Sequence, residues 1–180
     1  MEREFLFRGK TKETNEWVYG GVFVQDGRHF IVKEITYECG TKSWGAFEVD
    51  PKTVGQFIGK VDKRGNQIFE DDLCLMTYPV AIETGKIKEL GVSSYVQATH
   101  LGICKYYEYA TAFECVNKHG RVYRFFNSIK ASDDCCDYAE VVGNVYDNPE
   151  YICPVCRYQW KNSNTLADGK EPCRACGEFI

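Results

Sequence analysis

The sequence lacks a long hydrophobic run. In its 180 residues no stretch approaches the roughly 18 uninterrupted apolar residues that span a bilayer. The first residues, MEREFLFRGK, are too charged, and their apolar run is too short, for a signal peptide. We therefore expect a cytoplasmic protein that does not enter a membrane.

Positive charge is also scarce. The chain has 22 Lys and Arg against 26 Asp and Glu, and residues 71–150 hold 7 basic residues against 12 acidic ones. No segment has the basic excess with which proteins usually neutralise nucleic-acid phosphates. Nucleic-acid binding is therefore not favoured, although folding can still gather basic residues on one face.

Helical periodicity is nearly absent. Short aromatic and β-branched runs recur instead, separated by Gly, Asn and Asp, as in EWVYGGVFV, HFIVKEITYE, RVYRFF and EVVGNVY. The pattern predicts a mainly all-β fold, with a small antiparallel body that is barrel-like or otherwise rich in sheet. A short helix is expected only within residues 82–101, where Gly85 and Gly91 limit its length.

Two short segments predict hairpins. DKRG, at Asp62–Gly65, and NKHG, at Asn117–Gly120, place Asp or Asn first and Gly last. This order suits a type I turn followed by a left-handed glycine, which joins antiparallel strands, and it makes His119 an exposed turn residue. A weak internal repeat, FRGKTKETNEWVYG from Phe7 and FIGKVDKRGNQIFE from Phe57, predicts two similarly built hairpins in one sheet system.

Four of the ten cysteines have the spacing of metal ligands. A reducing compartment favours thiolate ligands or buried thiols over disulfides. CPVC and CRAC lie sixteen residues apart, and each such turn can present two sulfurs to one ion. Zinc is the expected metal, with iron in a rubredoxin-like setting and a metal-free cluster as alternatives. Four thiolates leave no open position for water or substrate, so the site is expected to be structural and not catalytic. The predicted ligands are Cys153, Cys156, Cys173 and Cys176.

A domain boundary is expected near Glu150. It divides the chain into a β domain of residues 1–150 and a zinc-ribbon tail of residues 151–180, which is too short to fold without a metal or a partner. Within the tail, aromatic residues suit a protein contact better than the few cations suit a phosphate contact. The aromatic residues are Tyr158, Trp160 and Phe179, and the cations are Arg157, Lys161, Lys170 and Arg174.

Most of the other cysteines have a structural interpretation. Cys74, Cys104 and Cys115 lie in apolar, strand-like runs and are predicted core residues. Cys135 and Cys136 form a vicinal pair in an acidic stretch. A redox role for this pair is not favoured, because nothing basic nearby would lower a thiol pKa.

Candidates for catalysis are weak. Glu70, Asp71 and Asp72 are predicted to form a solvated strand end and not a cation site, because adjacent carboxylates on a strand point in different directions. His100 and Cys104 are four residues apart but lack a third orienting group. Early aromatic residues are predicted sheet core and not a base-stacking platform: Trp17, Tyr19 and Trp44. No enzymatic activity is expected.

Four stretches resemble one family. They are FRGK at Phe7–Lys10, EWVYG at Glu16–Gly20, VDPKTVGQFIGKVDKRGNQIFEDDL at Val49–Leu73, and VVGNVYDNPE at Val141–Glu150. Together they are similar to the YopX protein family of phages and prophages. The resemblance implies a β-rich, barrel-like fold and a phage gene, and it supplies no established activity and no catalytic residue. Asp71 stands where the family usually has Gly, residues 78–113 look expanded, and the cysteine tail lies beyond the usual family end.

These observations predict a zinc-binding phage or prophage accessory protein in the cytoplasm of a bacterial host. We expect a protein-interaction module whose partner is an unidentified host or phage protein. Alternatives are a nucleic-acid-binding accessory protein, an inhibitor of a host defence or regulatory protein, and an enzyme that uses the acidic cluster. The first alternative requires a basic face beside exposed aromatics, and the last requires converging carboxylates. Assembly into a homo-oligomer stays open.

Overall fold

The computed structural model describes residues 5–82, 94–107, 112–117, 122–124, 135–136 and 138–151. Within these ranges the chain is mostly strand, arranged in two mainly antiparallel sheets, so the all-β prediction is confirmed. No helix in the described ranges is long and apolar enough to cross a membrane.

The first sheet has seven strands in the order β11-β5-β1-β2-β3-β4, with β6 paired to β5. Its strands from β1 to β4 pair in sequence, each antiparallel to the next. Only β11 joins in parallel. The bounds are β1 Phe7–Lys10, β2 Trp17–Gln25, β3 Arg28–Thr36, β4 Lys42–Val49, β5 Gly55–Asp62, β6 Gln67–Phe69 and β11 Cys135–Cys136.

Strands β1 to β4 close on themselves. The amide of Lys12 donates to the carbonyl of Glu48 at 3.0 Å, and the amide of Asp50 donates to the carbonyl of Lys10 at 2.8 Å. A Cβ at Gly20 would lie 2.0 Å from the Val32 carbonyl oxygen, so β2 coils against β3 where it has no side chain. The closure is barrel-like, as expected, and it encloses a core of Val18, Ile31 and Val49 with Phe7, Val22, Phe47 and Val54.

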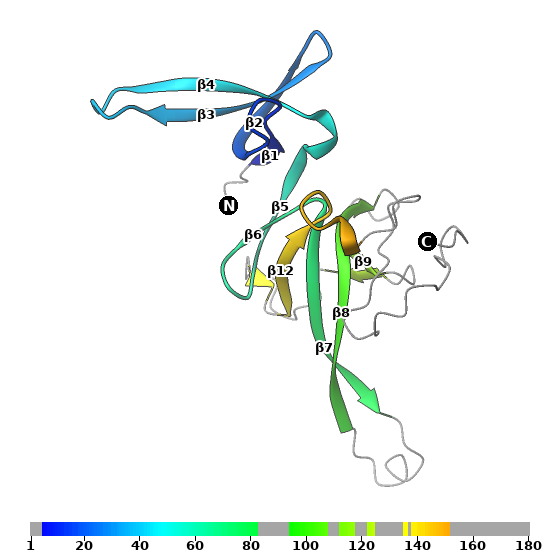
Figure 1. The fold of residues 1–180 in the computed structure, drawn as a ribbon. Coiled ribbons are helices and arrows are strands. Elements are labelled where there is room, and N and C mark those ends of the chain that lie inside the picture. The colour runs from blue at the N-terminus through cyan, green and yellow to red at the C-terminus, as the bar shows by residue number, and fades with distance from the viewer. Residues whose placement is uncertain are drawn as a thin grey trace.

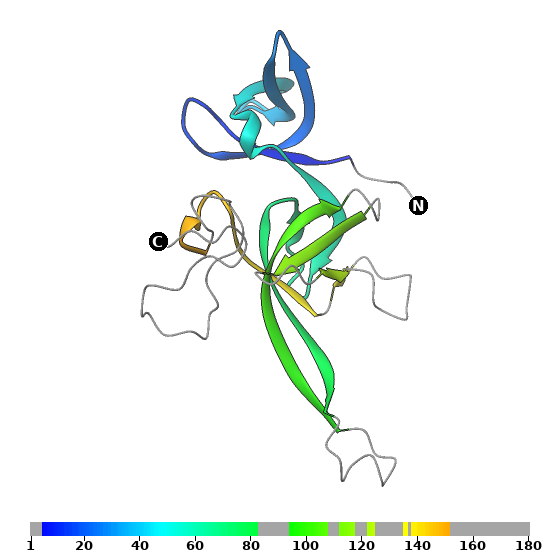
Figure 2. The same ribbon diagram turned by 90° about the vertical axis from the view of Figure 1, so that its right-hand side faces the viewer.

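The second sheet has five strands in the order β10-β9-β8-β7-β12, all antiparallel. Its longest hairpin, β7–β8, extends away from the first sheet (Figure 2). Two apolar clusters stabilise it, one centred on Ile68, Met76 and Cys104, the other on Leu73 and Ile103. The bounds are β7 Asp72–Ile82, β8 Ser94–Tyr107, β9 Ala112–Asn117, β10 Val122–Arg124 and β12 Ala139–Asn144.

The two hairpin predictions have different outcomes. In the DKRG turn the amide of Gly65 donates to the carbonyl of Asp62 at 2.9 Å, and Gly65 has φ of 85°. This turn joins β5 to β6 as predicted. Strands β9 and β10 also pair antiparallel, although His119 and its turn lie outside the described residues. The internal repeat is confirmed, since β1–β2 and β5–β6 are hairpins of one sheet.

The predicted helix within residues 82–101 is wrong for its second half. Ser94 to Leu101 belong to β8, which pairs with β7 along its length. Residues 83–93 lie outside the described residues. Pairing with β7 overrides the weak local preference of residues 94–101 for a helix.

One hairpin projects from the first sheet. Strands β3 and β4 extend well beyond the rest of the described chain (Figure 1). After β4 the chain turns through the short helix η1, Pro51–Thr53, whose cap is Asp50. A second short helix, η2, Pro149–Tyr151, comes after β12 and begins at a proline.

Candidate functional site

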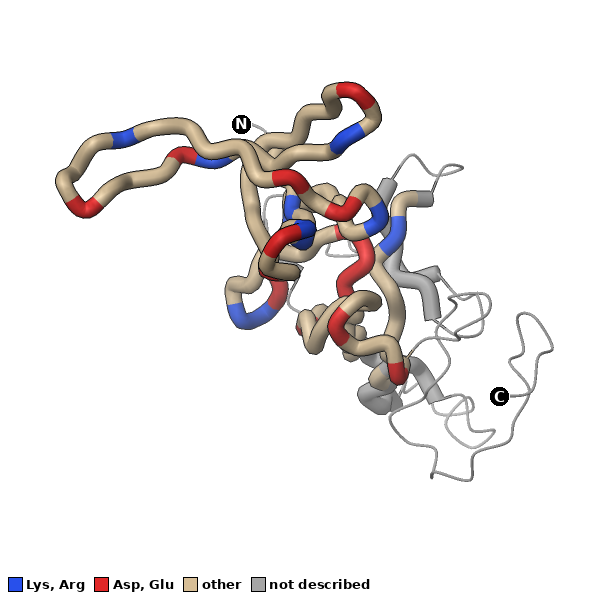
Figure 3. The backbone as a smooth tube through the Cα atoms, turned by 45° about the horizontal axis from the view of Figure 1, so that its top comes forward, with Lys and Arg blue, Asp and Glu red and all other residues tan. Residues whose placement is uncertain are grey.

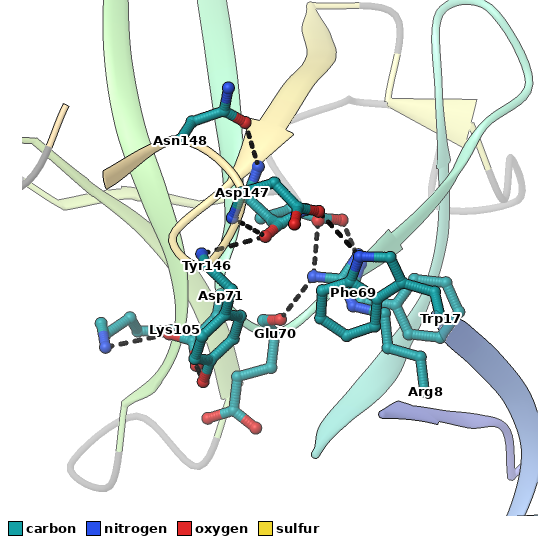
Figure 4. Close-up of polar contacts among 11 residues, drawn as sticks. Arg8, Trp17, Phe69, Glu70, Asp71, Lys105, Tyr146, Asp147 and Asn148 are labelled. Atoms are coloured by element: carbon teal, nitrogen blue, oxygen red, sulfur yellow. Dashed lines mark hydrogen bonds and ion pairs between the residues drawn. The ribbon is translucent and has the colours of Figure 1, made fainter. Parts of the chain in front are cut away.

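A buried ion pair links the two sheets. Arg8 of β1 and Asp72 of β7 lie 2.7 Å apart, from Nη2 to Oδ1, with side chains 7% and 1% exposed. The guanidinium also lies over two aromatic rings, 4.7 Å from the centroid of Trp17 and 5.0 Å from that of Phe69 (Figure 4). It donates to the carbonyl of Glu70 at 3.1 Å. The pair is therefore desolvated and holds β1 and β2 against the start of β7.

The carboxyl of Asp72 is held in an environment that disfavours its charge. Burial raises the pKa of Asp72 to about 6. Arg8 and the amide of Phe69, which donates to Asp72 Oδ2 at 2.8 Å, favour the charged form and only partly offset the burial. The nearby Asp71 acts in the same direction as burial. This carboxyl therefore titrates close to neutral pH.

A second carboxylate lies close to the same junction. Asp147, in the turn after β12, binds the ammonium of Lys10, accepts from Trp17 Nε1 at 2.7 Å, and accepts from Asn144 Nδ2 at 2.8 Å. Partial burial alone would raise the pKa of Asp147, but these three donors lower it to about 2. Trp17 therefore contacts both Arg8 and Asp147 and connects the two ion pairs.

A third carboxylate, that of Asp71, binds two other side chains. It accepts from the Tyr146 hydroxyl at 2.8 Å and from the Lys105 ammonium at 3.0 Å. Its backbone is left-handed, with φ of 66°, and its carbonyl accepts from the amide of Val145 at 3.0 Å. The chain reverses here between β6 and β7 and turns Asp71 and Asp72 toward different cations.

The solvated strand end predicted for Glu70, Asp71 and Asp72 is therefore wrong, because Arg8 folds over it from far away in the sequence. The expectation that the adjacent carboxylates diverge is confirmed. Asp72 binds Arg8, whereas Asp71 binds Lys105. Among the described residues no three His, Cys, Asp or Glu side chains are grouped to hold a metal.

A second feature is an aromatic surface on strands β2 to β4. Phe23 and Phe30 lie opposite each other, and their rings stack at 4.9 Å with an interplanar angle of 11°. Trp44 pairs with Glu34, four residues after Phe30, and therefore lies on the same side of the sheet. Trp44 is 73% exposed and Phe23 38%. We call Phe23, Phe30 and Trp44 the aromatic face.

The prediction of a core role holds only in part for the early aromatic residues. Trp17 is half-buried against Arg8 and Tyr146, whereas Tyr19 and Trp44 are exposed, so the prediction is wrong for these two. The alternation of side chains along a strand shows that the sheet has two faces. It does not show whether the rest of the chain covers both of them. On this side Tyr146, in the turn after β12, contacts Trp17.

The predicted cysteine roles are resolved for two residues. Cys74 and Cys104 are fully buried, which confirms them as core. Burial of Cys104 also places it away from solvent, and the side chain of His100 lies outside the described residues, as does that of Cys115. Cys135 and Cys136 form strand β11, without described side chains. The four predicted metal ligands lie outside the described residues: Cys153, Cys156, Cys173 and Cys176.

Residues 6–152 match the family model described as YopX protein. The chain belongs to the YopX family. No curated protein matches it. All of the residues in the junction lie within the matched range, and they come from each of the four stretches that resemble the family. FRGK contributes Arg8, EWVYG contributes Trp17, QIFEDDL contributes Asp72, and GNVYDN contributes Asp147. The YopX motifs therefore meet in one network.

Arg8 and Asp147 were not identified from the sequence. Arg8 sits among strand-forming residues and Asp147 in the turn after β12, and each lies in a stretch that carries the YopX resemblance. Their place in those stretches was the available signal. Their partners are 64 and 137 residues distant, at Asp72 and Lys10, so no local pattern connects them.

Proposed function

We propose that this YopX protein is a protein-binding accessory module that acts through its aromatic face. The observation that supports it is the exposure of Trp44, on β4 of the projecting β3–β4 hairpin, and of Phe23, on the neighbouring strand β2. Large aromatic side chains carry much of the binding energy of protein interfaces.

The charges around this face favour a protein over a nucleic acid. Lys12 and Arg28 both bind Glu48, and Lys42 binds Glu34 at 2.7 Å. Together with these two glutamates the three cations carry a net charge of only +1, which is little for a phosphate contact. Figure 3 shows Lys and Arg interspersed with Asp and Glu along the described chain, without a separate basic region.

The proposal includes a structural metal in the C-terminal tail. Its support is the donor chemistry, since four thiolates in two CxxC pairs suit zinc, or less well iron. The residues that would hold it are Cys153, Cys156, Cys173 and Cys176. When bound, the ion would supply the folding free energy that a short tail lacks. We place the protein in the cytoplasm of a phage-carrying bacterium, with a host or phage protein as partner.

The second candidate, an inhibitor of a host defence or regulatory protein, is a special case of the same binding activity. It rests on the phage character that the YopX resemblance implies. Identification of the captured protein distinguishes it from an accessory role in phage assembly or replication.

Capture from nuclease-treated host lysate tests the proposed function. The immobilised full chain should retain a specific protein, and a Phe23→Ser/Trp44→Ser double variant should lose it because the apolar anchors are gone. Val142→Ser is the matched control, since Val142 is 48% exposed on the second sheet and should leave capture unchanged. Unchanged capture by the double variant would contradict the proposal. So would micromolar binding of random DNA or RNA at physiological salt that disappears when Arg28 and Lys42 are replaced by Ala.

A further inference from the structure

The outer edge of β4 is unpaired among the described residues. β4 is the last strand of the first sheet, and β3 is its neighbour along the whole strand. Only its end is covered, where the carbonyl of Glu48 accepts from the amide of Lys12. The stretch from Lys42 to Phe47 has no such cover and lies on the projecting hairpin (Figure 1).

The direction of its backbone groups follows from that one bond. In an antiparallel strand the amide and carbonyl of a residue point to the same side, and the direction alternates along the chain. Because Glu48 faces outward, Ala46, Trp44 and Lys42 face outward as well. The groups of Ala46, Trp44 and Lys42 form a row of unused donors and acceptors, which natural proteins usually protect with Pro, bulges or several charges. Here the pairing of β3 with β4 is unbroken, and in the uncovered stretch from Lys42 to Phe47 only Lys42 is charged.

The free edge is complementary to itself. If two copies of β4 run antiparallel about Gly45, Trp44 of each chain lies opposite Ala46 of the second copy. A large side chain then meets a small one on both sides of the axis. The pairing ends there, because the amide of Lys12 already covers Glu48. Both members of the Trp44–Ala46 pair face outward, so they can exchange backbone hydrogen bonds in both directions.

The residue at the two-fold axis suits this arrangement. Gly45 would meet its own copy in a non-hydrogen-bonded pair, where the two Cα atoms approach to about 4.5 Å. The side chain of Ile35 already occupies the space of a Cβ there, since a Cβ on Gly45 would lie 2.3 Å from Ile35 Cδ1. On the opposite side of the sheet the two Trp44 rings become diagonal neighbours, within reach of each other.

We propose that this YopX protein forms a symmetric dimer by antiparallel pairing of β4 with β4 of a second copy. The proposal rests on the proposed function, because a second copy of this chain is then one of the proteins that the projecting hairpin binds. The first sheets of the two copies become one continuous sheet, and Trp44 is removed from solvent. Phe23 and Phe30 stay accessible for another protein.

Analytical ultracentrifugation of the full chain over a range of concentrations tests the dimer. We expect reversible dimers in the micromolar range, and Ala46→Pro should weaken dimerisation by about tenfold or more, because proline removes the outward amide that the second copy needs. Ala46→Ser is the matched control, since it keeps the amide. Circular dichroism checks that each variant folds. If Ala46→Pro does not fold, Ala46→Glu at this exposed position replaces it, because a carboxylate there opposes Trp44 only in the dimer.

A mixed sample of two differently isotope-labelled chains tests the register. We expect an intermolecular nuclear Overhauser effect between the Trp44 indole and the Ala46 methyl group. A monomer at millimolar concentration, a dimer insensitive to both Ala46 variants, or a dimer without this contact would overturn the proposal. A monomer that still captures a host protein through Phe23 and Trp44 would overturn the dimer and leave the proposed function standing. Loss of both would refute the two together.

Discussion

Asp71 shows how one residue can be strained and still be stabilising. Its φ of 66° lies in the left-handed region, where a Cβ crowds the following carbonyl and glycine is favoured. Here the side chain offsets the backbone cost by accepting from Tyr146 and Lys105. At Asp71 the hydrogen bonds to Tyr146 and Lys105 therefore offset the conformational cost of the left-handed backbone.

Replacement of Asp71 by Ala or by Gly separates these two effects. Both variants lose the side-chain contacts, but only Ala keeps the left-handed strain, so we expect Asp71→Ala to be less stable than Asp71→Gly by about 1 kcal/mol. Urea unfolding at neutral pH measures the difference. The control pair is Gln67→Ala and Gln67→Gly at an exposed position of β6, where Gly should be the less stable residue. Equal stability of the two Asp71 variants would show that the position is unstrained.

At the scale of the elements, the Arg8–Asp72 pair joins β1 to β7 and makes the contact sensitive to pH. Burial raises the pKa of Asp72 from 3.8 to about 6. Between these values the folded chain holds a proton that the unfolded chain releases, so the free energy of unfolding falls as pH rises through this window. A shift of about two units corresponds to a loss of about 3 kcal/mol between pH 4 and pH 7.

Asp72→Asn should remove that loss. The variant keeps an oxygen that accepts from the amide of Phe69 but cannot ionise, so its unfolding free energy should be flatter than that of the wild type across the same window. Urea titrations at several values between pH 4 and pH 7 measure both slopes. Because Asp147 and Glu70 are present in both proteins, their contributions cancel in the difference. A parallel pH dependence in the two proteins would mean that Asp72 titrates normally.

The elements that could be predicted are those specified by neighbouring residues. The DKRG hairpin followed from Asp62 and Gly65 alone, since both act within the turn. The same Asp62 also accepts from the amide of Val141 in β12 at 2.9 Å. This contact was not predictable, because it depends on how distant strands pack. The exposure of Trp44 escaped prediction for the same reason, since burial of a strand's second side depends on what folds over it.

At the scale of the whole molecule, the described part forms its own hydrophobic clusters. All three lie within residues 7–151 and are built from strands of the two sheets and from adjoining segments. The Arg8–Asp72 and Lys10–Asp147 pairs then join the sheets through the YopX motifs. We expect a body with this core to fold without the tail, and the tail of residues 151–180 to have too few residues for a comparable core. We therefore expect body and tail to unfold separately.

Removal of one predicted ligand tests both the metal and this independence. Anaerobically purified protein should contain about one zinc ion per chain, and Cys173→Ser should lose it because three thiolates bind more weakly than four. Since metal binding is coupled to folding in such small units, the tail should unfold, while the strand signal and urea midpoint of the body stay unchanged. Elemental analysis, circular dichroism and urea unfolding measure these outcomes.

Cys39→Ser is the matched control, because Cys39 is exposed at the β3–β4 turn and its loss should leave the metal in place. Iron in the purified protein would change the identity of the ion, absence of any metal would contradict the site, and a body that unfolds with the tail would show one cooperative unit.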